Sequence, residues 1–195
     1  MKKIIFLGLL LPLVGIVSGC HSNVTRPEVA CILKQIGSSY TPGAVGYEGR
    51  ITHQDEQIEA LGDVATSDEL YQLAAADSVP MTRLAAFIAL MKQRPDIAKN
   101  LALMDIQSQA CVPALYGCDS YMESLANLRI EILQQEGRNY GLTKADSLAI
   151  DSCVLFTPHA KYLGYLTQLL MKLPPHPQYY TRVKALFLND HYIEA

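Results

Sequence analysis

The residues best suited to chemistry are the histidines and two neighbouring acid pairs. His53 is followed directly by Gln54-Asp55-Glu56, and an imidazole beside carboxylates could serve in general acid–base catalysis. These acids also open a predicted helix, as does the pair Asp68-Glu69. Carboxylates stabilise the dipole at a helix N-terminus, so we favour a structural role for both pairs. His159 likewise stands at a predicted helix start, and His176 lies in a proline-rich turn.

Motifs of the common enzyme classes are missing from the sequence. The zinc motif H-E-x-x-H does not occur, and no G-x-S-x-G nucleophile elbow follows the first twenty residues. The glycine-rich stretch 38–50 contains neither G-x-G-x-x-G nor G-K-[ST], so it does not match a phosphate-binding loop. We therefore predict a binding protein rather than an enzyme, with no catalytic residue, no cofactor and no metal site.

The start of the chain has the pattern of a secretory signal. Lys2 and Lys3 precede an almost entirely apolar run from Ile4 to Val17, and the small residues Ser18 and Gly19 follow. The apolar run is shorter than the roughly 20 residues that a membrane-spanning helix needs. We therefore predict a signal peptide over residues 1–19.

Val17-Ser18-Gly19-Cys20 resembles the lipobox of bacterial lipoproteins. The resemblance implies a diacylglyceryl group on Cys20, cleavage before it and an acylated new N-terminus. Several acyl chains anchor a protein firmly, because each buried methylene contributes about 0.8 kcal/mol. Residue 21 is His rather than the Asp that retains such lipoproteins at the inner membrane, which favours the periplasmic face of the outer membrane. The alternative is an ordinary cleaved signal with a cysteine there by chance.

Length and charge restrict the remaining possibilities. About 175 residues follow the signal, enough for one compact domain or one short helical array. Without Lys2 and Lys3, 14 basic side chains face 19 acidic ones, so the mature chain is near −5. Because no basic cluster occurs, nucleic acid is not an expected partner.

Four cysteines remain besides Cys20, an even number that suits two disulfides in an oxidising compartment. We prefer a local bridge between Cys111 and Cys118, with Pro113 and Gly117 between them in one predicted loop. Cys31 and Cys153 would then form the second bridge. A zinc site is less favoured, because the spacing is not C-x-x-C and no histidine lies nearby. The cysteines could also be unpaired buried thiols, or Cys153 could be a nucleophile with a distant histidine.

After a polar tether over residues 20–26, apolar residues at helical spacing predict an all-α domain over residues 27–195. Thr66 with Glu69, and Thr143 with Asp146, have capping-box spacing. We expect residues 107–119 to be irregular and the next helix to open at Ser120, and no strand is predicted. The expected helices are 27–36, 52–61, 67–76, 95–104, 120–136, 144–156 and 159–173. Another carries Met81 to Met91 between the turn 77–80 and the break at Arg94-Pro95, and a last one holds Tyr180, Val183, Leu186 and Phe187. The side of helix 144–156 expected to pack is Leu148, Ala149, Ser152, Cys153 and Phe156.

Two helix pairs resemble each other. Residues 67–86 and 159–185 each combine a helix, a proline-containing turn and a Thr-Arg dipeptide followed by small residues. The features around Arg83 and Arg182 resemble HEAT-type helical repeats, which implies an irregular α-α superhelix of HEAT-like pairs. This arginine commonly pairs with a nearby acid in such repeats, so both are expected to be structural. HEAT-like proteins are mostly binding scaffolds, so the resemblance implies recognition rather than chemistry.

The sequence therefore predicts a lipid-anchored envelope protein that contacts the bilayer through acylated Cys20 and binds another protein. Envelope assembly and an immunity-like role both fit this prediction. Two different functions stay open: an envelope hydrolase with its site in a concave groove, and a small-ligand carrier with a tyrosine-rich groove.

Overall fold

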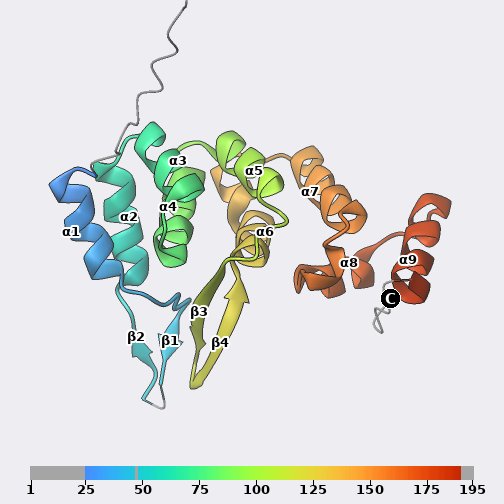
Figure 1. Cartoon of the computed structure of the whole chain (residues 1–195), viewed down its shortest axis with the longest axis horizontal. Helices are drawn as coiled ribbons and strands as arrows, with labels where there is room; N and C mark the ends of the chain where they lie inside the picture. Colours follow the sequence, from blue (N-terminus) through green and yellow to red (C-terminus); the bar gives the residue numbers. More distant parts are fainter. Residues whose placement is uncertain (1–24, 47, 190–195) are drawn as a thin grey trace, which may run out of the picture.

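The computed structural model describes residues 25–46 and 48–189, and helices dominate these ranges (Figure 1). The protein is all-α with a helical-repeat arrangement, as the sequence predicts. The helices are α1 Pro27–Ile36, α2 Gln54–Val64, α3 Ser67–Ala76, α4 Pro80–Gln93, α5 Pro95–Met104, α6 Leu125–Glu136, α7 Lys144–Phe156, α8 Tyr165–Lys172 and α9 Pro177–Asn189. Two 3-10 turns, η1 Gly137–Tyr140 and η2 Ala160–Tyr162, complete the helical segments. The predicted signal and Cys20 lie outside the described residues.

The helices form two layers. α3, α5 and α7 follow one another in one layer, and α2, α4, α6 and α8 do so in the other. α1 packs against α2, and α9 lies beyond α8, so α1 and α9 are at opposite ends of the array (Figure 1). Within the described ranges, none of the helices combines the length and apolar character that crossing a membrane requires.

Local signals fix most helix boundaries as predicted. The side chain of Thr66 accepts a hydrogen bond from the backbone N–H of Glu69, and Glu69 accepts one from the backbone N–H of Thr66. Thr143 and Asp146 form the same reciprocal pair at the start of α7. Prolines begin α1, α4, α5 and α9, at the position where the missing N–H costs no hydrogen bond.

Helix α4 forms the centre of the core. Its neighbours are α2, α3, α5 and α6, and nine of its residues are buried. Ala85, Ala86 and Ala89 are all fully buried, and their small side chains allow surrounding helices to approach closely.

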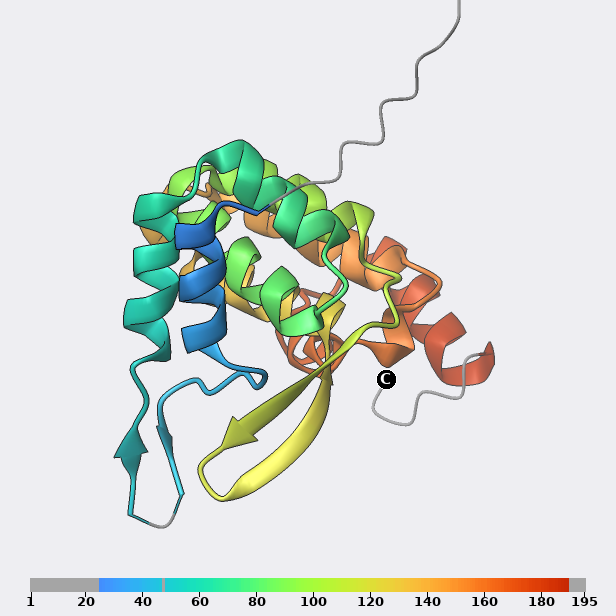
Figure 2. The ribbon, with the colours of Figure 1, turned by 60° about the vertical axis from the view of Figure 1, so that its left-hand side comes forward.

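Two β-hairpins correct the prediction that residues 107–119 are irregular and that no strand occurs. β3 Cys111–Tyr116 pairs antiparallel with β4 Asp119–Ser124, and α6 starts at Leu125, capped by Ser124, rather than at Ser120. β1 Ala44–Val45 and β2 Arg50–Ile51 form a smaller hairpin. Both hairpins project from the same side of the array and lie side by side (Figures 1 and 2).

Hydrogen bonds join the two hairpins. The backbone N–H of Tyr40 donates to the carbonyl of Pro113 (2.8 Å), and that of Leu115 donates to the carbonyl of Tyr40 (2.8 Å). The N–H of Gly46 donates to the carbonyl of Gly117 (2.7 Å). The α1–α2 and α5–α6 connections are therefore held together across the intervening α3–α4 pair.

The predicted disulfides are wrong for this structure, in which the four cysteines of the described region are free, exposed thiols. Cys111 begins β3 and Cys118 lies in the turn after it, so the extended strand separates them by on the order of 20 Å. A disulfide needs Cα atoms within about 7 Å of each other. Cys31 on α1 and Cys153 on α7 are separated by the helices between them (Figure 1).

The packed side of α7 also differs from the prediction. Leu148 and Phe156 are exposed, and the buried residues of α7 are Ile150, Val154 and Leu155. The helix is apolar on both sides, so its periodicity does not select one of them.

Candidate functional site

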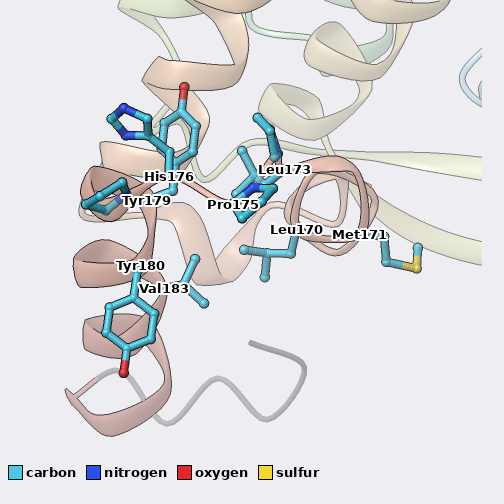
Figure 3. A pocket seen from close by; sticks show the side chains of 10 residues that line it. Leu170, Met171, Leu173, Pro175, His176, Tyr179, Tyr180 and Val183 are labelled. Atoms are coloured by element: carbon cyan, nitrogen blue, oxygen red, sulfur yellow. The ribbon is translucent and has the colours of Figure 1, made fainter.

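An open apolar groove lies between α8 and α9 at the C-terminal end of the array. Its volume is about 590 Å³. Figure 3 shows Leu170 from α8 and Val183 from α9 directed into the space between the two helices. Met171 and Tyr180 also line it and are 77% and 68% exposed, so the groove is a surface feature rather than an enclosed cavity.

The linker between α8 and α9 shapes one wall of this groove. Leu173, Pro174, Pro175 and His176 all contribute to the lining. Because proline fixes its own φ and restricts the residue before it, the linker has little conformational freedom. The His176 ring lies 5.4 Å from the ring of Tyr179, and its Nδ1 accepts a hydrogen bond from the backbone N–H of Gln178 (3.3 Å). The groove is therefore largely preformed.

Hydrogen bonds from Arg182 attach α9 to the C-terminal end of α7. Its Nε donates to the carbonyl of Leu155 (2.8 Å), and its Nη2 donates to the carbonyl of Thr157 (3.0 Å). Both acceptors belong to the C-terminal end of α7, where helix carbonyls lack partners within the helix. The predicted structural role of Arg182 thus takes the form of hydrogen bonds to a helix end.

Arg83, the second predicted repeat arginine, pairs with an acid. Its Nη2 lies 2.6 Å from Oδ2 of Asp105, and its Nε donates to the carbonyl of Ala74 (3.3 Å). The same Asp105 oxygen also lies 2.6 Å from Nη1 of Arg129, a residue for which the sequence predicts no role. Two arginines on α4 and α6 therefore share one carboxylate after α5.

A polar cluster between α6, α7 and α8 is likewise not predicted from the sequence. The hydroxyl of Tyr165 donates to Oδ1 of Asp151 (2.9 Å), and Nε2 of Gln134 donates to the same oxygen (2.7 Å). Asn127 accepts from the backbone N–H of Tyr165 (2.8 Å) and donates to Oε1 of Glu131 (3.0 Å). These contacts join polar side chains from three helices.

Burial raises the pKa of the Asp151 carboxyl, and the hydrogen bond from Tyr165 opposes that rise. Burial also raises the pKa of Glu131. Burial, followed by the hydrogen bond to Asp151, raises the pKa of the Tyr165 hydroxyl. A carboxyl of raised pKa can exchange protons, but Asp151 and Tyr165 are already engaged with each other. The cluster acts first as a polar contact that holds α8 against α6 and α7.

The predicted candidates for chemistry are not brought together. His53 is exposed at the start of α2, with its Nδ1 3.1 Å from Oε2 of Glu56. His159 and His176 lie before η2 and α9, at the other end of the array. Cys153 is exposed on α7. Among the described residues, no three His, Cys, Asp or Glu side chains form a group that could hold a metal ion.

Comparison of the chain with protein-family models, with curated proteins and with solved structures found no match. Function is therefore inferred from the chain's own residues, and above all from the groove. Its lining is mainly apolar and aromatic, and it includes the imidazole of His176. Such a surface can bury apolar side chains of a bound molecule.

Proposed function

We propose that this protein is a lipid-anchored protein of the bacterial cell envelope whose helical array binds another protein. The observation that carries the proposal is the open apolar groove between α8 and α9, with Met171 and Tyr180 exposed at its rim. Exposed apolar patches on otherwise polar proteins commonly mark interaction sites. The anchor is proposed from the lipobox pattern Val17-Ser18-Gly19-Cys20.

The dispersed histidines support binding over hydrolysis. A hydrolase needs its base, acid or nucleophile within hydrogen-bond reach of one substrate. His53 and His159 stand at helix starts near opposite ends of the array. The acid pairs Asp55-Glu56 and Asp68-Glu69 open α2 and α3, where they stabilise the helix ends.

The groove also gives a specific reason to consider a small-ligand carrier as a second candidate. Its volume of about 590 Å³ lies within the range of about 300–1,000 Å³ found for small-molecule pockets. Tyr179 and Tyr180 supply aromatic surface and hydroxyl groups at its edge. The exposed rim favours a protein, because a small-molecule site usually encloses most of its ligand.

Two measurements test the proposal. Cys20→Ala prevents acylation and should release the protein from membranes, whereas continued tight association would contradict the lipid anchor. The lipidated protein, used as bait in solubilised envelope membranes, should retain a partner protein at a constant ratio. The Cys20→Ala protein, added to the same solubilised extract, is the matched control for capture through the acyl chains.

Native mass spectrometry of the purified protein separates the two candidates. A binding scaffold should show the mass of the chain alone or with a protein partner. A bound small molecule, or turnover of one, without any protein partner would overturn the leading proposal in favour of the carrier or the hydrolase.

A further inference from the structure

Charge is divided unevenly along the array. Residues 26–157 contain 10 Lys or Arg against 17 Asp or Glu, whereas residues 158–189 contain four Lys or Arg and no Asp or Glu. The second range forms η2, α8, the proline-rich linker and α9. Asp190 and Glu194 follow in the sequence, so residues 158–195 contain four basic and two acidic side chains. This part of the chain is therefore basic, whereas residues 26–157 are acidic.

The same end exposes large apolar side chains. Phe187 and Leu188 on α9 are 52% and 54% exposed, in addition to Met171 and Tyr180 around the groove. In α9, Leu186 is the one residue described as buried, so most side chains of this helix are accessible to another molecule.

A lysine lies beside the apolar residues of α9. Tyr180, Lys184 and Leu188 follow one another at intervals of four, and residues at that spacing share one side of a helix. Lys184 is exposed, so a molecule seated in the groove would meet positive charge at the margin that α9 forms.

We propose that the groove and the adjoining face of α9 bind an acidic segment of a partner protein, with an apolar side chain inserted between Leu170 and Val183. A carboxylate of that segment faces Lys184. This inference depends on the proposed protein-binding function and adds the place of binding and the chemistry of the partner. The acidic remainder of the array repels such a segment, which steers it to the C-terminal end.

The position of the groove favours a protein over a lipid surface. The predicted tether joins the domain at Arg26, before α1. Its six residues after Cys20, from 21 to 26, span at most about 20 Å. α1 and α9 lie at opposite ends of the array (Figure 1). An anchor through Cys20 therefore holds the α1 end near the membrane and leaves the basic end for another molecule.

Site-specific photo-crosslinking in the full lipidated protein tests the inference. A photoreactive residue replaces Met171, and the matched control replaces Met104 on α5, which is 78% exposed against 77% for Met171. The Met171 position should form an adduct with a protein, and mass spectrometry should find a net acidic peptide at the crosslink. The Met104 position should form little or none of this adduct.

Charge reversal provides the second part of the test. Lys184→Glu should lower the adduct yield about threefold, because like charges across an interface suppress binding. Lys34→Glu on α1, also an exposed lysine but at the far end, should leave the yield unchanged. Unchanged circular dichroism and thermal unfolding confirm that each variant is folded.

The remaining outcomes overturn the inference in distinguishable ways. A lipid adduct at Met171 identifies a membrane contact, and an adduct with a second copy of the chain identifies self-association. A neutral or basic peptide at the crosslink, or a yield insensitive to charge reversal, contradicts the proposed chemistry. If the bait retains a partner that crosslinks at Met104 but not at Met171, protein binding stands and this site is wrong. No protein adduct at either position, with no partner on the bait, overturns both proposals.

Discussion

Replacing Asp105 by Asn should strongly destabilise the fold, because this carboxylate is shared by two arginines. Arg129 is 0% exposed, and its side chain lies between Oδ2 of Asp105, the carbonyl of Ala74 and the ring of Phe87, whose centroid is 5.1 Å from Cζ. Within the described structure, its Nε is a buried donor without a hydrogen-bond partner. Burial lowers the pKa of Arg129 to about 10, while the nearby Asp105 charge opposes that fall.

The size of the effect follows from leaving a buried charge unpaired. Removing one partner of a buried ion pair costs about 3–5 kcal/mol, and Asp105 is 27% exposed, so we expect about 3 kcal/mol. Arg129→Met removes the buried charge itself and leaves Asp105 paired with Arg83. Its cost should be smaller, about 1–2 kcal/mol for the lost hydrogen bonds.

The double variant makes this reasoning refutable. Urea unfolding of a chain starting at His21, followed by circular dichroism, gives the free energy of unfolding for each variant. Asp105→Asn with Arg129→Met should cost about 2 kcal/mol less than the sum of the single changes, because the two side chains act as one unit. Asp96→Asn, in the exposed pair with Arg94, is the control and should leave the unfolding midpoint unchanged. Additive effects, or a loss below about 1 kcal/mol for Asp105→Asn, would refute the buried-pair account.

Three further predictions concern pH, thiols and a turn. Hydrogen bonds from Arg26 and then Thr66 lower the pKa of Glu69 from 4.5 to about 2; its contribution to the free energy of unfolding is therefore present above pH 4.5 and lost as the pH falls towards 2. Glu69→Gln should make the unfolding midpoint less dependent on pH over that range. If the pH dependence is unchanged in this variant, the Arg26–Glu69 pair is not its cause. Gly117 has φ +62°, so Gly117→Val should cost about 1–2 kcal/mol in urea unfolding, whereas Gly62→Ala, whose added Cβ would lie 3.7 Å from Ala89, should cost less. The folded chain that starts at His21 is alkylated without reductant and then weighed by mass spectrometry. Four cysteines should be modified, namely Cys31, Cys111, Cys118 and Cys153. A smaller number would indicate that a disulfide forms.

The helices could be predicted because their boundary signals are local. A capping box such as Thr66 with Glu69 acts within three residues, and a proline such as Pro95 affects only the backbone beside it. Neither signal depends on what the helix packs against. The order of helices, and the turns between α3, α4 and α5, therefore follow from the sequence alone.

The hairpins could not be predicted because β3 lacks a visible alternation. Val112 and Ala114 are fully buried, but the intervening Pro113 and Leu115 are also apolar. Pro113 suggests a loop. In the structure its carbonyl accepts from the N–H of Tyr40 and so points away from β4, and the N–H that proline lacks is therefore not one that would bond to β4. Tyr40 lies 73 residues away in the sequence, so no local pattern reveals this partner.

The candidate site was only partly visible from sequence for a related reason. Apolar periodicity predicted one helix over 159–173 and the proline-rich turn after it. The structure has that turn as the α8–α9 linker, but it divides 159–173 into η2 and α8, with a break at Leu163 and Gly164. It could not show that Leu170 and Val183 face an open groove, because the pattern does not distinguish packing within the chain from packing with a partner. Arg129 and Asp151 were missed since their partners come from distant helices.

The two ends of the array suit different tasks. Arg26 donates to both carboxylate oxygens of Glu69 and to the carbonyl of Val64, which clamps the start of α1 to the corner between α2 and α3. Under the proposed anchoring, the short tether therefore joins the domain at a fixed point rather than at a loose end. The apolar groove would then be held at the opposite end of a packed array, so the helices themselves would set its position relative to the membrane. Under both proposals, a partner bound there would be recruited to the membrane without having to contact lipid.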